Sequence, residues 1–319
     1  MRLTSPIGLG IRALLSAGVA GAVLVASVVV VAVSGAALLL AVPALVASDG
    51  WLERGLPWGV AVSAVLVLPA FALVVGYLVR YERRLLLEGT APVTAIDAEE
   101  PRALDDDATR FATQFGVPKP QIRLHPASAP FAYATSRPND PLLGVRRTGE
   151  PVIVVSKGLV RTLPRDETAA VLAHEFAHLA NDELRLTAWL LVPLVAAEFL
   201  HDGRETPTDG REPLEWLLAT VALAGVGVFS RGREIAADRA AVAATGDPGS
   251  LASALERLDG HRSSRPTTDL RKHARSTNAV SVLPTLGTAN SPSGLRSTHP
   301  PLETRLEALR SLSRERRNL

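Results

Sequence analysis

The sequence predicts a mainly α membrane protein: an α+β domain with a small sheet, plus two transmembrane hairpins. Three observations support this fold class. Residues 13–47 carry no charged side chain and exceed the ~20 apolar residues that cross a bilayer. Two further apolar segments, 186–200 and 214–229, stand close together in the middle of the chain. The sequence from about residue 91 onward is otherwise polar enough for a folded domain, and it contains both helical and strand patterns.

The first predicted hairpin comprises the apolar spans 13–47 and 57–79, joined by the polar segment 48–54. Positive charge lies outside this pair of spans, because arginines precede the first span and follow the second. The positive-inside rule then places both outer ends in the cytoplasm. We therefore expect residues 1–85 to form an N-terminal transmembrane hairpin of a multi-pass cell-membrane protein whose main domain is cytoplasmic. The arginines concerned are Arg2, Arg12, Arg80, Arg83 and Arg84.

The composition excludes several kinds of site and partner. The chain has no cysteine, so any metal must be held by histidine or carboxylate side chains. The formal net charge is only +2, and no basic stretch is interleaved with aromatic residues. Nucleic acid is therefore not an expected partner.

The first part of the main domain, residues 86–185, should combine helices with short strands. A stripe of apolar residues at helical spacing predicts a helix over Pro101–Phe115. The β-branched run Pro151–Ser156 predicts a strand. Another helix should begin at Pro164, which suits a first turn because it lacks an N–H, and end near Asn181. Two more strands and a short helix are expected at Gln121–His125, Phe131–Thr135 and Lys157–Leu163.

The helix expected after Pro164 carries the motif HExxH, as His174-Glu175-Phe176-Ala177-His178. Histidines four residues apart project from one helix face, where both can bind the same Zn²⁺. Glu175 would then lie beside a water activated by the metal and can take its proton as a general base.

Residues 186–230 are predicted to form a second membrane hairpin with an acidic loop at 201–212. Each apolar arm has about 15 residues, which is marginal for crossing a bilayer. Two buried helices of the soluble core are therefore the alternative to membrane insertion.

A further set of candidate ligands follows this hairpin. Glu234 and Asp238 are four residues apart in a predicted helix, so they share a face. A catalytic zinc held by two histidines needs a third protein ligand, and Glu234 is the natural candidate. Asp238 can accept a hydrogen bond from the free N–H of a ligating histidine. Residues 231–319 should therefore form the second part of the catalytic domain.

The C-terminal part of the chain contains one long polar segment between two predicted helices, Ser250–Leu258 and Leu302–Arg314. Residues 259–297 are rich in Ser, Thr, Arg, Pro and Gly, which predicts a flexible loop. His261 and His273 within it have no partner at ligand spacing, so we expect both to face solvent.

The ordered set of motifs resembles the HtpX-type membrane zinc metalloproteases, HExxH gluzincins that are related to the CAAX prenyl proteases. The matching features are the two N-terminal spans, HEFAH with Asn-Asp behind it, an apolar hairpin, SRGREIAAD and the late THPP. The resemblance implies a zincin-like catalytic domain with one Zn²⁺ on His174, His178 and Glu234, and with Glu175 as base and acid. It also implies an endopeptidase that cleaves membrane or misfolded proteins at the cytoplasmic face, in protein quality control. Its partners would be protein or peptide substrates and the lipid bilayer.

The resemblance also suggests a catalytic role for His299, which corresponds to a family histidine near the catalytic cleft. An imidazole there can stabilise the oxyanion of a tetrahedral intermediate. A turn or capping histidine before Pro300-Pro301 is the alternative.

A substrate-binding strand follows from the resemblance as well. The family's edge strand usually contains NAFATG, and residues 129–135 correspond to it, although Pro130 and an extra Tyr133 depart from the pattern. An exposed edge of this kind binds an extended peptide by strand addition. A second departure is Gly232, which replaces the first Glu of a Ser-Arg-Glu-Arg-Glu pattern. The candidate substrate-binding residues are Phe131, Ala132, Tyr133 and Ala134.

Two other functions stay open. A CAAX-type processing protease acting on lipidated C-termini would enclose a chamber with more spans than the four predicted here. A catalytically inactive membrane scaffold would hold zinc structurally, with four protein ligands. Three ligands and an intact base favour catalysis, whereas His299 as a fourth ligand would restore the structural interpretation. It could equally be a latency ligand, with the loop 259–297 folding over the metal.

Overall fold

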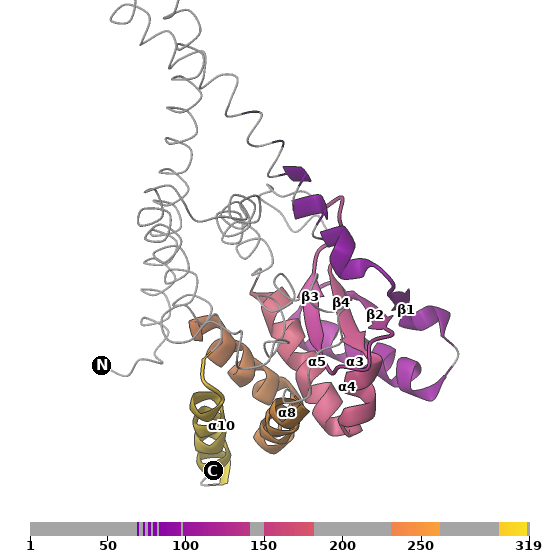
Figure 1. Ribbon diagram of the computed structural model, residues 1–319. Coiled ribbons are helices and arrows are strands. Elements are labelled where there is room, and N and C mark those ends of the chain that lie inside the picture. Colours follow the sequence, from indigo (N-terminus) through magenta and orange to yellow (C-terminus); the bar gives the residue numbers. More distant parts are fainter. Residues whose placement is uncertain are drawn as a thin grey trace, which may run out of the picture.

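The computed structural model describes five stretches of the chain and a few helical positions before them (Figure 1). The stretches are 83–96, 98–140, 150–181, 231–261 and 300–317, and the earlier positions are Pro69, Leu73, Gly76, Tyr77 and 79–81. Among these residues, no helix has both the length and the apolar character needed to cross a membrane. The predicted spans 13–47, 186–200 and 214–229, most of 57–79, the segment 262–297 and His299 lie outside the described residues.

The described elements alternate between short strands and longer helices. In chain order they are β1 (Ala91–Pro92), the 3-10 helix η1 (Val93–Ala95), α3 (Glu99–Phe115), β2 (Gln121–His125), β3 (Ala132–Thr135), β4 (Val152–Ser156), α4 (Lys157–Thr162), α5 (Arg165–Ala180), α8 (Pro248–His261) and α10 (Leu302–Arg317). Residues 231–245 are also helical. This content confirms the expectation of a mainly helical fold with a small sheet.

The small sheet is mixed, with strand order β1-β2-β4-β3. Strands β2 and β4 are parallel, with Ile122 opposite Ile153, whereas β3 runs antiparallel to β4, with Ala134 also opposite Ile153. All five residues of β4 are buried. Its continuous β-branched run suits a strand that is covered on both faces. The sequence pattern did not predict β1, because it is only two residues long and forms through antiparallel pairing with β2.

Helix α5 is the centre of the fold. Every residue from Glu167 to Leu179 is buried. A helix that is buried on all sides must be covered by several elements, and α5 contacts α3, β3, α4 and α8. Pro164 lies at its N-cap position, one residue before the first helical residue. The central position of α5 fixes the side chains of the HExxH motif inside the domain.

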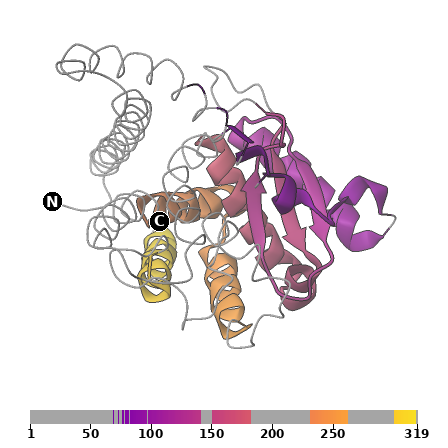
Figure 2. The ribbon, with the colours of Figure 1, turned by 45° about the horizontal axis from the view of Figure 1, so that its top comes forward.

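Beyond α5, the helices form successive layers on the side away from the sheet (Figure 2). Helix α8 packs on α5, and α10 packs on α8. Gly246, with φ of 78°, makes the turn between the helical residues 231–245 and α8, because this left-handed conformation strains other residues. Helices α8 and α10 each extend three residues past their predicted ends, to His261 and Arg317.

The opposite face of the sheet is covered by the helical residues 83–87, which follow the second predicted span. Leu86 packs there with Phe131 and Tyr133 in a second, smaller hydrophobic cluster. The Tyr133 hydroxyl donates a hydrogen bond to the carbonyl oxygen of Leu86 at 2.5 Å. Burial raises the pKa of the Tyr133 hydroxyl above its ordinary range. The sheet is therefore enclosed between α5 on one face and the 83–87 segment on the other.

Candidate metal centre

Two histidines of α5 meet at the centre of the domain. His174 and His178 lie one helical turn apart, and both are buried. Their Nε2 atoms are 3.1 Å apart, and the two rings are perpendicular. Two imidazole nitrogens that face each other at this distance need a shared proton or cation between them, because two lone pairs would repel.

The carboxylate of Glu234 completes a three-residue cluster. Glu234 belongs to the helical residues 231–245. Its Oε2 is 3.4 Å from His174 Nε2, and its Oε1 is 3.6 Å from His178 Nε2. Tetrahedral zinc with bonds of about 2.0–2.1 Å separates its ligand atoms by roughly 3.3 Å. The three buried side chains therefore fit a zinc ion, and their ligand atoms all lie within 4.8 Å of one another.

Asp238 lies one turn after Glu234 and faces the other nitrogen of His174. The distance from its Oδ1 to His174 Nδ1 is 3.0 Å. A hydrogen on Nδ1 leaves the Nε2 lone pair for a metal. Burial by itself lowers the pKa of His174, but Asp238 and Glu234 outweigh burial and raise that pKa to about 9. The two carboxylates thus favour a positive charge at this position, which a proton or a metal cation can supply.

Arg305 of α10 was not among the residues that sequence reasoning selected, yet it belongs to this cluster. Its Nε and Nη2 donate to the two oxygens of Asp238 at 2.8 and 2.6 Å. Its Nη1 is 3.6 Å from Glu234 Oε2. The signal in the sequence is the position of Arg305 beside Leu306 on the buried stripe of the C-terminal helix, where an arginine is unusual.

Glu175 is fully buried beside these ligands on α5. Neither of its carboxylate oxygens has a hydrogen-bond partner of good geometry among the described residues. Burial raises its pKa to about 8, and the charge of Glu234 adds to this increase, whereas His174 and Arg233 oppose it. The Ala134 backbone lies close enough to lower this pKa, but no side chain of the described residues makes a hydrogen bond of good geometry to the carboxyl group, which remains available to exchange a proton.

The candidate substrate strand lies against the same site by only one of its faces. Ala132 and Ala134 pack in the main core with α5, whereas Phe131 and Tyr133 point to the opposite face of the sheet. The backbone of Ala134 contributes to the environment of Glu175, since it slightly lowers the pKa of that carboxyl. All four residues are buried, and β3 is the last strand of the described sheet.

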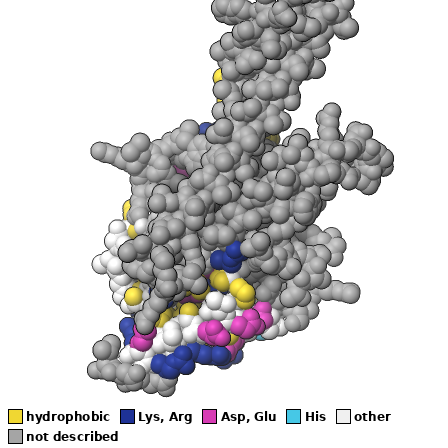
Figure 3. Space-filling model, turned by 90° about the vertical axis from the view of Figure 1, so that its left-hand side faces the viewer, with side chains coloured by type: hydrophobic (Ala, Val, Ile, Leu, Met, Phe, Trp, Pro, Cys, Tyr) yellow, Lys and Arg dark blue, Asp and Glu magenta, His cyan; other side chains and the backbone are white. Residues whose placement is uncertain are grey.

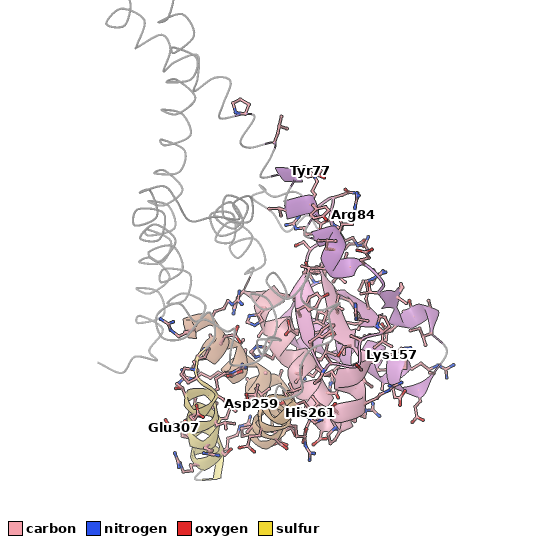
Figure 4. All side chains as sticks on the ribbon, in the orientation of Figure 1. Tyr77, Arg84, Lys157, Asp259, His261 and Glu307 are labelled. Carbon is pink, nitrogen blue, oxygen red and sulfur yellow. The ribbon has the colours of Figure 1, made fainter. Side chains whose placement is uncertain are left out.

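The remaining residues named from the sequence lie apart from the centre or outside the described part. His261 is exposed at the end of α8, as expected, where its Nδ1 lies 2.8 Å from the Arg257 carbonyl oxygen (Figure 4). Gly232 is buried in the helical residues 231–245. His299 and His273 are outside the described residues.

Comparison with known proteins gives a consistent family. The profile of Peptidase family M48 matches residues 99–313. A protein named Protease HtpX homolog, from Moorella thermoacetica, is 32% identical over 272 residues, which cover 81% of this chain and 86% of the relative. Protease HtpX homolog 2 from Methanosarcina acetivorans is 31% identical over 249 residues, covering 74% and 80%. Protease HtpX homolog 1 from Streptomyces coelicolor is 32% identical over 272 residues, covering 79% and 84%.

One solved structure is also similar, the crystal structure of S. mikatae Ste24p. It shares 19% identity with this chain, with a TM-score of 0.40. The match covers 86% of this chain and 63% of the Ste24p chain.

Proposed function

The chain belongs to peptidase family M48 and is a metalloprotease, and from this premise we propose that it is a membrane-anchored zinc endopeptidase. Its substrates would be membrane or misfolded proteins, cleaved at the cytoplasmic face in protein quality control. The observation that carries the proposal is the cluster of His174, His178 and Glu234 with the buried, structurally unused carboxyl group of Glu175 beside it.

In the proposed mechanism, His174, His178 and Glu234 hold one zinc ion. Bound zinc supplies Lewis-acid polarisation of the scissile carbonyl group and lowers the pKa of a water molecule. With three protein ligands, the site would keep a position for water or substrate, as catalytic rather than structural zinc sites do. Asp238 keeps the ring of His174 in the tautomer whose Nε2 lone pair faces the site.

Glu175 carries the proton in this mechanism. A carboxylate oxygen of Glu175 takes a proton from the attacking water and returns it to the nitrogen of the leaving amine. Its burial on α5 beside His174 supports this role, because it places the carboxyl group next to the proposed metal site. The second step regenerates the carboxylate, so Glu175 is unchanged after each turnover.

Residues Phe131 to Ala134 would align the substrate. The backbone of Ala132–Thr135 would pair with an extended peptide, because β3 is the last strand of the described sheet and Ala134 is close to Glu175. The side chains of Phe131 and Tyr133 would act indirectly, since they anchor the strand from the opposite face. His299 is the proposed stabiliser of the oxyanion, on the strength of the sequence motif alone.

The membrane location is proposed from the sequence. The apolar spans 13–47 and 57–79 and the arginines that flank them support a multi-pass anchor with a cytoplasmic catalytic domain. Arg80 and Arg84 are exposed on the helical residues that lead from the second span into the domain, and Figure 4 shows Tyr77 and Arg84 on this connection. Tyr77 and Tyr81 are exposed there and stack on each other, which supports the proposal because aromatic side chains are enriched at membrane interfaces.

The test is proteolysis of an unfolded membrane protein in detergent, with zinc content measured in parallel, for the wild type and Glu175→Gln. We expect the wild type to cleave and the variant to retain zinc without cleaving. A wild type that binds zinc but cleaves none of several substrates would favour the scaffold function. A wild type that binds no zinc after supplementation would refute the metal assignment.

A further inference from the structure

We propose that Arg305 is a positioning residue for the metal centre, and that through it the C-terminal helix α10 supports that centre. The inference rests on the proposed zinc site and deepens it. Arg305 reaches the site through Asp238, which faces His174, so its effect on a metal would be indirect.

Packing alone does not explain an arginine at this position. Helix α10 exposes Glu303, Glu307 and Arg310, and Figure 3 shows charged side chains on this side of the molecule. Its inner face buries Leu306 and Leu309 together with Arg305, whose side chain is fully buried. A leucine or methionine would fill the same space without the cost of removing a guanidinium group from water.

The contacts of Arg305 show what compensates for that cost. Two parallel hydrogen bonds from its guanidinium group engage both oxygens of Asp238, a bidentate geometry that fixes the carboxylate in position and orientation. The charges of Asp238 and Glu234 oppose the effect of burial and keep the pKa of Arg305 above its ordinary value. A buried ion pair of this kind adds little net stability compared with apolar packing. Its presence is therefore better explained by the position it gives to Asp238.

Asp238, held in this position, in turn orients the ring of His174. Its Oδ1 accepts from Arg305 Nη2 and lies 3.0 Å from His174 Nδ1, so one oxygen is shared by the two groups. The ring of His174 is held on the side opposite the metal-facing Nε2. Groups that orient a ligating histidine in this way typically change metal affinity by about 10–100-fold when they are removed.

The chain offers a matched set of variants for the test. Arg305→Met removes the charge and keeps a long apolar side chain, and Arg305→Lys keeps the charge but loses the bidentate geometry. Arg310→Met is the control, because Arg310 lies on the same helix, is largely exposed and pairs with Glu256 rather than with the site. All are made in the full-length protein and compared by zinc affinity in a chelator competition, kcat and KM on an unfolded protein substrate, and thermal unfolding.

We expect Arg305→Met to lose about 10–100-fold in zinc affinity and to lower kcat at subsaturating zinc, with KM unchanged. Arg305→Lys should recover part of the zinc affinity, and Arg310→Met should match the wild type. Zinc affinity of Arg305→Met within twofold of the wild type would overturn the inference, as would a fall in unfolding temperature with no change in zinc affinity. If Arg305→Met does not fold, the test rests on Arg305→Lys, and unchanged zinc affinity in Arg305→Lys overturns the inference.

A double-variant cycle tests whether Arg305 acts through Asp238. Asp238→Asn and Arg305→Met should each weaken zinc binding, and the double variant should lose no more than the larger single effect, because both remove the same support. Additive losses would overturn the proposed route. Zinc affinity is measured without substrate, so a protein that binds zinc and cleaves nothing would refute the endopeptidase function while leaving the Arg305 inference testable.

Discussion

Two buried glutamates on the same helix differ in what their carboxylates contact. Glu167, in the first turn of α5, accepts hydrogen bonds at Oε1 from Ser253 Oγ at 2.7 Å and from Arg257 Nε at 2.9 Å, both on α8. Glu175 lies two turns later, and neither of its oxygens has such a partner among the described residues.

This difference separates a carboxylate that joins two helices from the one that we propose acts in catalysis. Burying a carboxyl group is costly unless hydrogen bonds or an opposite charge offset the cost. At Glu167 the partners offset that cost and join α5 to α8. At Glu175 burial instead raises the pKa of the carboxyl to about 8, a typical property of functional acids and bases.

The largest expected effect comes from Glu175→Gln, which keeps the shape of the side chain and removes the proton acceptor. We expect kcat to fall by about 10²–10⁴-fold, the usual contribution of a general base, while zinc content and KM stay near wild type. The measurement is steady-state proteolysis of an unfolded protein with zinc quantified in the same samples. Less than a tenfold loss of kcat would exclude Glu175 as the base.

Zinc removal should lower both the activity and the stability of the protein. It also tests whether either glutamate is needed for zinc binding. At a zinc concentration of 100 times Kd, binding adds about 2.7 kcal/mol to the free energy of unfolding, so chelation should lower the unfolding temperature and abolish cleavage. Glu167→Gln and Glu175→Gln should both show this stabilisation by added zinc, because neither residue is a proposed ligand. No change in unfolding temperature between zinc-loaded and chelated protein would contradict the metal site.

Glu167→Gln tests the other glutamate, and here we expect a loss of stability rather than a loss of activity. Loss of the charge should weaken the bonds from Arg257 and Ser253 and lower the free energy of unfolding by about 1–2 kcal/mol, less than for a fully buried pair because Arg257 is half exposed. The specific activity of the folded enzyme should be unchanged. A variant that is as stable as the wild type but inactive would reverse the roles assigned to the two glutamates.

The smallest effect is expected on the far face of the sheet. Tyr133→Phe removes only the hydroxyl that donates to the Leu86 carbonyl, and it should cost about 1 kcal/mol of unfolding free energy. Tyr81→Phe is the matched control, because Tyr81 is exposed on the preceding helical residues and should show no effect. Chemical denaturation of both variants gives the comparison, and equal stability of the two would show that the Tyr133 hydrogen bond adds nothing.

Local patterns predicted the parts of the structure that depend on neighbouring residues. The spacing of apolar residues located α3, and the β-branched run located β4 within one residue at its start. The expected ligands His174 and His178 came from motif spacing, Glu234 came from the need for a third ligand, and the fold brings these three side chains together.

Features that depend on distant segments were not predictable in the same way. β1 exists only through pairing with β2, and the contact of Arg305 with Asp238 depends on α10 reaching the helical residues 231–245. The burial of Phe131 and Tyr133 depends on the 83–87 segment, which packs on both side chains. The residues of a strand and its neighbours do not indicate which distant element will pack on that strand.

The division of the metal centre among separate segments has a consequence during biosynthesis. The histidines of α5 emerge from the ribosome first, Glu234 and Asp238 emerge later, and Arg305 emerges last. A partly synthesised chain therefore contains two imidazoles and the base Glu175 without the third ligand or its support. On the proposed mechanism, the nascent chain would lack a complete zinc site until Glu234 has come to lie beside His174 and His178.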